Sequence, residues 1–356
     1  MDSGLDGVIV ADTVMSEVDG EGGRLIVRGH GLQELVAGRG FEGVAALLWS
    51  GYGDGGNDEP AVRDGLAAAR ARAFADVPRL LAATKGLNPV EALRVGLAML
   101  PDSDPTPHHY LVCGAMPVFL AALLNAHKGL SAIAPDPTLT TAQDLLRMIR
   151  GQRAGEVFEK GLDTYLATVA DHGFNASTFT ARVVGSTRAG LISSVLAALC
   201  ALKGPLHGGA PGPVLDMLDE IGEAERARAW FDQALARGER LPGFGHRIYK
   251  VRDPRADVLK ATVADMPMTA GRLAFAANVE KEALAALRRH KPGQRLDTNV
   301  EYYTATLLEA LDVPRAAFTA LFAVGRVAGW CAHIFEQEEG GRIIRPQSNY
   351  VGPRPQ

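Results

Sequence analysis

Apolar segments with helical spacing recur along most of this chain, and this pattern limits its fold more than any other feature. Apolar residues fall three or four positions apart in stretches such as 40–53, 115–129, 141–151, 188–204 and 314–338. Most of these stretches close on Gly or Pro, as helices commonly do. The sequence therefore predicts an all-α fold, mainly helical.

Strand signals are confined to the beginning of the chain. Residues 5–30 alternate loosely between apolar and polar side chains and contain Asp-Gly and Gly-Gly pairs, which are typical of tight hairpin turns. We expect one small N-terminal β-hairpin there. The 356 residues exceed what a single hydrophobic core usually serves, so two lobes are predicted.

Charge and cysteine usage exclude several functional classes. The net charge is −4, so nothing global favours nucleic acid, and any cationic site must be local. Cys113, Cys200 and Cys331 are too widely spaced for a disulfide framework or a metal-binding knuckle, so we expect no metal and a reducing, cytoplasmic environment. The N-terminus lacks the features of a signal peptide, and the apolar stretch 189–202 is too short to span a bilayer, so no membrane segment is expected.

One short stretch, LPGFGHRIYKVRDPR at 241–255, combines a histidine in a Gly-Phe-Gly turn with four cations. His246 follows the glycines Gly243 and Gly245, and Arg255 ends the stretch. Arginine suits bidentate recognition of a carboxylate, so the stretch indicates an anionic ligand. The alternative is a solvated face with weak surface ion pairs.

Two further candidates each have an ordinary structural explanation. His207, in GPLHGGAPG, precedes glycines that let backbone approach a ligand closely, but it also fits a capping or packing histidine. Glu301 lies three residues after Thr298, which matches a helix capping box and needs no catalytic role.

Arg326 lies on a helix that is apolar almost all round, in line with Phe322 and Trp330. A buried guanidinium without an anion is costly, so its partner is either an internal carboxylate or a bound ligand. His172, in DHGFNASTFTARV, stands just before a helix that Asn175 or Ser177 is expected to cap. The sequence contains no P-loop, H-E-x-x-H, G-x-S-x-G or C-x-x-C motif.

Taken together, these motifs resemble the citrate synthase family, particularly its short bacterial, actinobacterial type. The resemblance is carried by segments in the order that the family shows, covering nearly the whole chain: GRLIVRGH, DHGFNASTFTARV, GPLHGGAP, GFGHRIYKVRDPR, NVEYYTATLLEALDVP, FAVGRVAGWCAH and IIRPQSNYVGP. It implies a two-domain helical enzyme, with residues 1–207 and 313–356 in a large domain and residues 208–312 in a small one.

The resemblance also implies roles for single residues in condensing acetyl-CoA with oxaloacetate. His207 matches the histidine that hydrogen-bonds the thioester carbonyl, and His246 matches the one that polarises the oxaloacetate ketone. Glu301 falls on the family's catalytic base. Acetyl-CoA would be a co-substrate, with no permanently bound cofactor.

The remaining matches concern binding. Arg255 and Arg326 match arginines that hold the oxaloacetate carboxylates, and His172 matches a further histidine of that pocket. Arg345 matches an arginine that the second subunit of a homodimer supplies. Lys250, with the turn glycines 243 and 245, is expected to serve the CoA moiety.

Three departures from the family pattern stand out: Glu301 replaces an aspartate, Gly173 replaces a glutamate, and Gln347 replaces an arginine. An extra methylene moves a base by about 1 Å, which can cost roughly 10²-fold in rate unless the backbone compensates. Two alternatives to citrate synthase therefore stay open. One is a 2-methylcitrate synthase using propionyl-CoA, and the other is a non-catalytic protein of the same fold.

Overall fold

The computed structural model describes residues 4–5, 7–53, 58–208, 211–266 and 270–355, and it confirms the predicted helical fold. The elements run in the order β1 (Ser16–Asp19), β2 (Arg24–Val27), β3 (His30–Gly31), α1 (Leu32–Gly38), α2 (Phe41–Trp49), α3 (Glu59–Phe74), α4 (Val77–Ala83), α5 (Pro89–Ala98), α6 (His108–His127), α7 (Thr141–Arg150), α8 (Glu156–Val169), α9 (Ala176–Gly185), α10 (Leu191–Leu202), α11 (Pro211–Ile221), η1 (Ala224–Arg226), α12 (Ala227–Ala236), α13 (Pro254–Ala264), α14 (Ala270–His290), α15 (Val300–Ala310), η2 (Arg315–Ala317) and α16 (Phe318–Gly340).

Local sequence signals explain where several helices begin and end. Asn88 and Asn175 cap α5 and α9 with side-chain oxygens that accept backbone N–H groups of the first turn. Thr140 and Gln143 form a reciprocal capping box at α7. Gly341 ends α16 in the left-handed conformation that glycine adopts readily.

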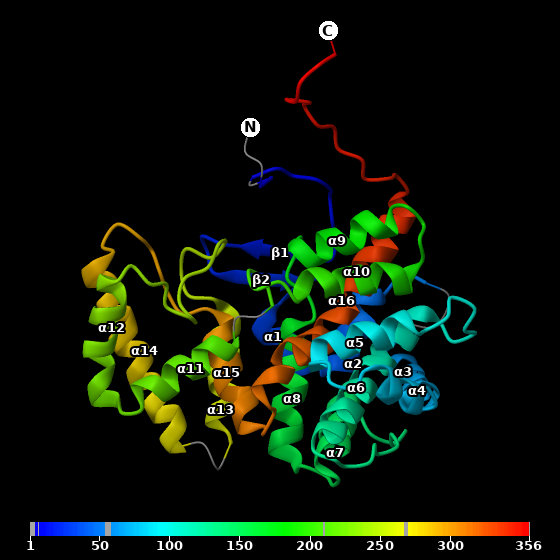
Figure 1. The fold of residues 1–356 in the computed structure, drawn as a ribbon, viewed down its shortest axis with the longest axis horizontal. Helices are drawn as coiled ribbons and strands as arrows, with labels where there is room; N and C mark the ends of the chain where they lie inside the picture. Colours follow the sequence, from blue (N-terminus) through cyan, green and yellow to red (C-terminus); the bar gives the residue numbers. More distant parts are fainter. Residues whose placement is uncertain (1–3, 6, 54–57, 209–210, 267–269, 356) are drawn as a thin grey trace.

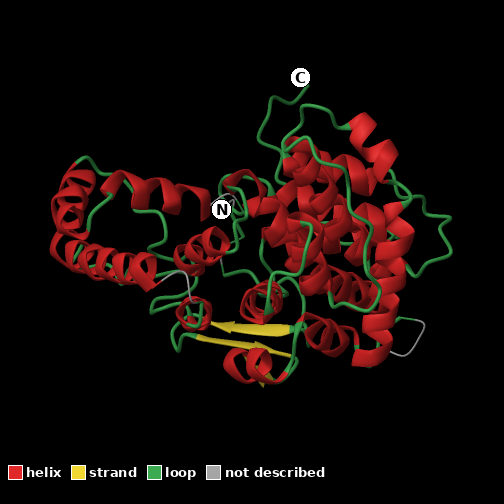
Figure 2. Ribbon diagram, turned by 90° about the horizontal axis from the view of Figure 1, so that it is seen from below, coloured by secondary structure: helices red, strands yellow, loops and turns green. Residues whose placement is uncertain are grey.

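The predicted hairpin is present and has one additional short strand. β1 and β2 pair antiparallel, with Ser16 opposite Val27 and Asp19 opposite Arg24, and β3 adds to the other edge of β2. Leu25 and Val27 point into the core at alternate positions, as expected for a sheet with one buried face. Figure 2 shows this sheet between two groups of helices.

Helices α6 and α16 form the centre of the larger group. α6 packs against α3, α5, α7 and α16, and α16 also contacts α2, α8, α9 and α10. Both are long and apolar enough to cross a membrane, but 89% and 83% of their most apolar windows are buried within the protein. Both are longer than the apolar stretch at 189–202, and most of each is covered by the protein itself.

Helices α11 to α15 form the second group, on the left of Figure 1. α11 and α13 pack on α15, and α12 packs on α14. α13 also contacts α1 and α8 of the larger group. The segments that carry His246 and Glu301 both belong to this second group, and they meet near its junction with the larger one.

Candidate active site

A short antiparallel contact ties the His246 turn to the start of α15. The amide of Gly245 donates to the carbonyl of Asp297 at 2.7 Å, and the amide of Asn299 donates to the carbonyl of Gly243 at 3.0 Å. The side-chain amide of Asn299 also reaches the Gly245 carbonyl at 2.9 Å. Residues 52 to 56 positions apart in sequence are thereby held in one unit.

The glycines of this turn are required by its backbone. Gly243 and Gly245 both have φ of +84°, in the left-handed region that other residues avoid. A Cβ on Gly243 would also lie 2.8 Å from the ring of Tyr302. Turn geometry alone thus accounts for both glycines.

The surroundings of His246 fix which ring nitrogen carries its proton. Nδ1 accepts the backbone N–H groups of Ile248 at 3.0 Å and Tyr249 at 3.1 Å. An atom that accepts two hydrogen bonds has no proton of its own, so the neutral ring carries its hydrogen on Nε2. Burial, followed by the charge of Arg255, lowers the pKa of His246 to about 4. The ring is therefore a neutral donor at pH 7.

His207 is neutral as well, with the opposite ring nitrogen protonated. Its Nε2 accepts the backbone N–H of Ser177 at 3.3 Å and lies 2.9 Å from the Ser177 hydroxyl. Ser177 lies in the first turn of α9, where helix N–H groups lack intrahelical partners. Burial and Arg326 lower the pKa of His207 to about 4. Its Nδ1–H is the proton available to a ligand.

His172 is buried beside His246. Its Nε2 is 3.2 Å from the hydroxyl of Tyr249, and its ring meets that of His246 edge to face at 5.7 Å. Burial is the largest cause of its strongly lowered pKa, followed by Arg255 and Arg326, with His246 and His207 adding to the effect. The structure thus brings His172 and His246 together from separate segments of the chain.

Arg255 is buried and already has an internal partner. Its guanidinium contacts both oxygens of Asp253, with Nε at 3.0 Å and Nη2 at 2.7 Å. Asp253 also accepts the amide of Val300 at 3.2 Å, so it joins the first turn of α13 to that of α15. This arrangement holds the arginine rigidly beneath the His246 turn.

The sequence left open whether the partner of Arg326 is an internal carboxylate or a bound ligand. Arg326 is 1% exposed, and its Nε donates to the carbonyl of Val169 at 2.6 Å. Among the residues that the structure describes, no carboxylate lies within ion-pair distance of it. Burial lowers its pKa to about 10, opposed mainly by Asp171. A buried cation lacking a paired carboxylate is suited to an anionic ligand.

Glu301 does not act in a capping box. The hydroxyl of Thr298 donates instead to Glu280, at 2.7 Å, and the residue that caps α15, Asn299, makes no side-chain cap bond. The Oε2 atom of Glu301 is buried and has no hydrogen-bond partner within the described part of the chain. Burial raises the pKa of Glu301, with Arg255 opposing the change. A carboxylate with a raised pKa is a stronger base than an ordinary one.

Comparison with known proteins shows the family of this chain. The family model for the citrate synthase C-terminal domain matches residues 4–347. Citrate synthase of Haloferax volcanii is 35% identical over 368 residues, covering 99% of this chain and 96% of that protein. The chain belongs to the citrate synthase family.

Solved citrate synthases share the whole fold. The Thermotoga maritima enzyme superposes with a TM-score of 0.88 at 32% identity, over 99% of this chain and 96% of that one. The Thermoplasma acidophilum enzyme, solved as a ternary complex with carboxymethyl coenzyme A and oxaloacetate, gives a TM-score of 0.87 at 26% identity, covering 100% of this chain and 97% of that one.

Arg345 is not brought to the histidine cluster of its own chain. It is exposed on the extended tail that follows α16, and Figure 1 shows this tail leaving the body of the molecule. The tail is attached at Ile344, whose amide donates to the Ser186 hydroxyl at 3.0 Å. Lys250 is exposed close to His246, with its Nζ 3.2 Å from the carbonyl of Arg247.

One of the departures from the citrate synthase pattern has a structural explanation. Gly173 has φ of +60°, and a Cβ there would lie 3.2 Å from Val18 of the N-terminal hairpin. A glutamate at this position would be strained and crowded.

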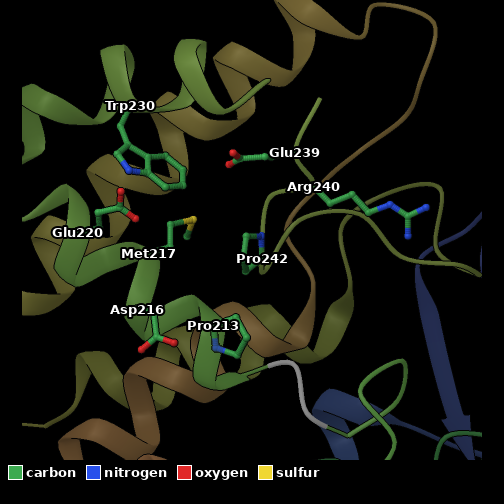
Figure 3. A pocket seen from close by; sticks show the side chains of 8 residues that line it. All are labelled: Pro213, Asp216, Met217, Glu220, Trp230, Glu239, Arg240 and Pro242. Atoms are coloured by element: carbon green, nitrogen blue, oxygen red, sulfur yellow. The ribbon is translucent and has the colours of Figure 1, made fainter. Parts of the chain in front are cut away.

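A separate pocket of roughly 350 Å³ opens between α11, α12 and residues 239–242. Figure 3 shows Trp230 and Met217 on its apolar wall, with Glu220 and Glu239 at its edge. None of the predicted site residues lines it, so it is not the histidine–arginine cluster.

Sequence reasoning missed Tyr249 and Asp253 as members of the site. Tyr249 is 1% exposed and touches both His172 and His246, while Asp253 binds Arg255 and α15. The only sequence signal for either was its place within the YKVRDPR run.

Proposed function

We propose that this chain catalyses the condensation of acetyl-CoA with oxaloacetate, followed by hydrolysis of the thioester, to give citrate and CoA. The observation that carries the proposal is the buried, unpartnered carboxylate oxygen of Glu301, held in one unit with the neutral donor His246. A non-catalytic protein has no need for a carboxylate kept in this costly state.

The first step is removal of a methyl proton from acetyl-CoA. Glu301 takes the proton, and the electron pair of the C–H bond moves to the thioester oxygen. That carbon is a weak acid, so the developing enolate needs a hydrogen bond to its oxygen. The Nδ1–H of neutral His207 supplies this bond while Ser177 holds the other side of the ring.

The enolate carbon then attacks the ketone carbon of oxaloacetate. The Nε2–H of His246 donates to the ketone oxygen, which gains negative charge as the carbon–carbon bond forms. Water subsequently cleaves the thioester and releases CoA. Because the two histidines have a pKa of about 4, both remain neutral donors at pH 7.

Arg326 and Arg255 suit the two carboxylates of oxaloacetate. Both are fixed before the ligand arrives, Arg326 by Val169 and Arg255 by Asp253, so little side-chain freedom is lost on binding. His172 adds a ring that meets that of His246 edge to face.

The complete site is proposed to need a second subunit. Arg345 lies on an exposed tail, so a homodimer could deliver it to the partner's site, with two-fold symmetry making both tails reciprocal. Exposed apolar side chains on both chain ends, including Ile9, Val14, Ile343 and Val351, support burial of these segments against another copy.

The division into domains is part of the same proposal. Residues 208–312 would close as a small domain on residues 1–207 and 313–356, and closure would exclude water from the reacting carbons. Lys250 would meet the phosphates of CoA at the rim. The free cysteines Cys113, Cys200 and Cys331 support a cytoplasmic location.

A thiol-release assay tests the proposed reaction. Acetyl-CoA and propionyl-CoA are each supplied with oxaloacetate, and free CoA is followed with a thiol reagent. Faster release with acetyl-CoA is expected. A preference for propionyl-CoA would indicate a 2-methylcitrate synthase, and binding of both substrates without release would indicate a non-catalytic protein.

A further inference from the structure

The N-terminal hairpin is attached to the segment that carries His172. The hydroxyl of Ser16, the first residue of β1, donates to the buried carboxylate of Asp171, and it accepts the amide of Gly173 at 2.8 Å. These two residues flank His172 on either side. Val18, further along β1, covers Gly173. One end of the hairpin is therefore fixed to the wall of the site that belongs to the larger helical group.

The other end of the hairpin is attached to the loop that carries His246. The carbonyl of Gly20, directly after β1, accepts the amide of Lys250 at 2.9 Å. Gly23, on the far side of the turn, lies against Val251 and the carbonyl of Arg252. This second attachment is to the wall formed by the α11–α15 group.

We propose that the β1 strand acts as a spacer between His172 and His246, and that Gly20 is a positioning residue for the ketone-polarising histidine. This inference rests on the proposed function. Four extended residues at about 3.3 Å each hold the two attachments about 13 Å apart. A paired strand is stiff along its length. A shift at Gly20 therefore moves the His246 loop, because β1 cannot shorten or bend to absorb it.

Only glycine fits at the attachment to the His246 loop. A Cβ on Gly20 would overlap the carbonyl oxygen of Ile248 and lie 2.9 Å from its carbonyl carbon. Both are backbone atoms, which cannot turn aside as a side chain can. Ile248 also donates its amide to Nδ1 of His246, so any displacement of this backbone reaches the ring directly.

The test variant is Gly20→Ala, and its matched control is Gly31→Ala. Gly31 belongs to β3 of the same sheet, has φ of −67°, and an added Cβ there meets nothing within 4 Å. A displacement of His246 by about 1 Å is expected to lower kcat roughly 10²-fold. The KM for oxaloacetate should change less than about threefold, because Arg326 stays fixed by Val169 and Arg255 by Asp253. Gly31→Ala should match the unchanged protein in both kcat and the KM for oxaloacetate.

A spectroscopic measurement separates positioning from general damage. The infrared stretching frequency of the oxaloacetate ketone falls when a hydrogen-bond donor polarises it. The bound ketone should therefore absorb at lower frequency than free oxaloacetate in the unchanged protein and in Gly31→Ala, and return toward the free value in Gly20→Ala.

The kcat and the ketone frequency together separate a failure of the spacer from a failure of the proposed role of His246. Unchanged kcat in folded Gly20→Ala, or a lowered kcat with the ketone still fully polarised, overturns the spacer. An unpolarised ketone in the unchanged protein refutes the proposed role of His246 instead. If Gly20→Ala does not fold, Ser16→Ala replaces it, since that change releases the opposite attachment without a steric overlap. Ser16→Ala should then show the same loss of polarisation, and full polarisation would refute the spacer.

Discussion

Replacing Glu301 with glutamine should abolish proton abstraction and yet stabilise the protein. Gln has nearly the same size but cannot accept the methyl proton, and general base catalysis typically contributes 10²- to 10⁴-fold. The rate of acetyl-CoA methyl exchange should fall by that factor. Stability should rise because the buried Oε2 of Glu301 has no partner within the described residues and its burial raises the pKa.

The size and pH dependence of the stability gain follow from the same two observations. Removing an unsatisfied buried charge is expected to add about 2 kcal/mol to the free energy of unfolding. For 356 residues the entropy of unfolding is about 0.75 kcal/mol/K, so Tm should rise by about 3 °C. The folded pKa lies above the ordinary 4.5, so ionisation opposes folding only above pH 4.5. The gain should therefore be present at pH 8 and absent near pH 4.

The measurement combines deuterium exchange into acetyl-CoA, in the presence of an unreactive oxaloacetate analogue, with thermal unfolding at both pH values. Glu309→Gln is the control on the same helix. Glu309 is bound by Arg272 at 2.8 and 3.0 Å, so its loss should lower Tm slightly and leave exchange unchanged. Exchange at the unchanged rate in Glu301→Gln, or a loss of stability such as a missing helix cap would cause, would refute the reasoning.

Three further outcomes are expected. His246→Ala should keep its circular dichroism spectrum but lose condensation, because the ring faces the site through Nε2; near-normal turnover in a folded variant would contradict this. The acid limb of kcat should fall with an inflection above pH 4.5, since Glu301 must be ionised and His207 stays neutral down to about pH 4; a limb centred at or below 4.5 would argue against Glu301 as the base. Mixing inactive Arg345→Ala and His246→Ala under subunit exchange should restore activity to about a quarter, because roughly half the dimers are mixed and each has one intact site; no recovery, with exchange confirmed by mass spectrometry, would exclude a shared site.

The sequence was sufficient for the helical fold and for the candidate residues, for a physical reason. Helices are set by local spacing, capping residues and glycine or proline stops, and these are visible in segments such as 141–151 and 189–204. The candidates His207 and His246 stand in glycine-flanked turns, so their type and setting could be recognised without knowing what lay near them.

Other features depended on contacts between distant segments, which spacing along the chain does not reveal. The pattern at Thr298 and Glu301 predicted a capping box, but the Thr298 hydroxyl goes to Glu280, which leaves the Glu301 carboxylate unpartnered at Oε2. Likewise, no local signal links Ser16 to Asp171, 155 positions away.

The chain by itself therefore determined which side chains are available for chemistry, and the tertiary structure decided their protonation and surroundings. His207 and His246 are the same residue type, but they adopt different tautomers. Ser177 donates to Nε2 of His207, which leaves the hydrogen on Nδ1, while the amides of Ile248 and Tyr249 donate to Nδ1 of His246, which leaves the hydrogen on Nε2. A side chain's pKa and tautomer depend on burial and on neighbouring donors. Those are properties of the folded arrangement, because the neighbours come from other parts of the chain.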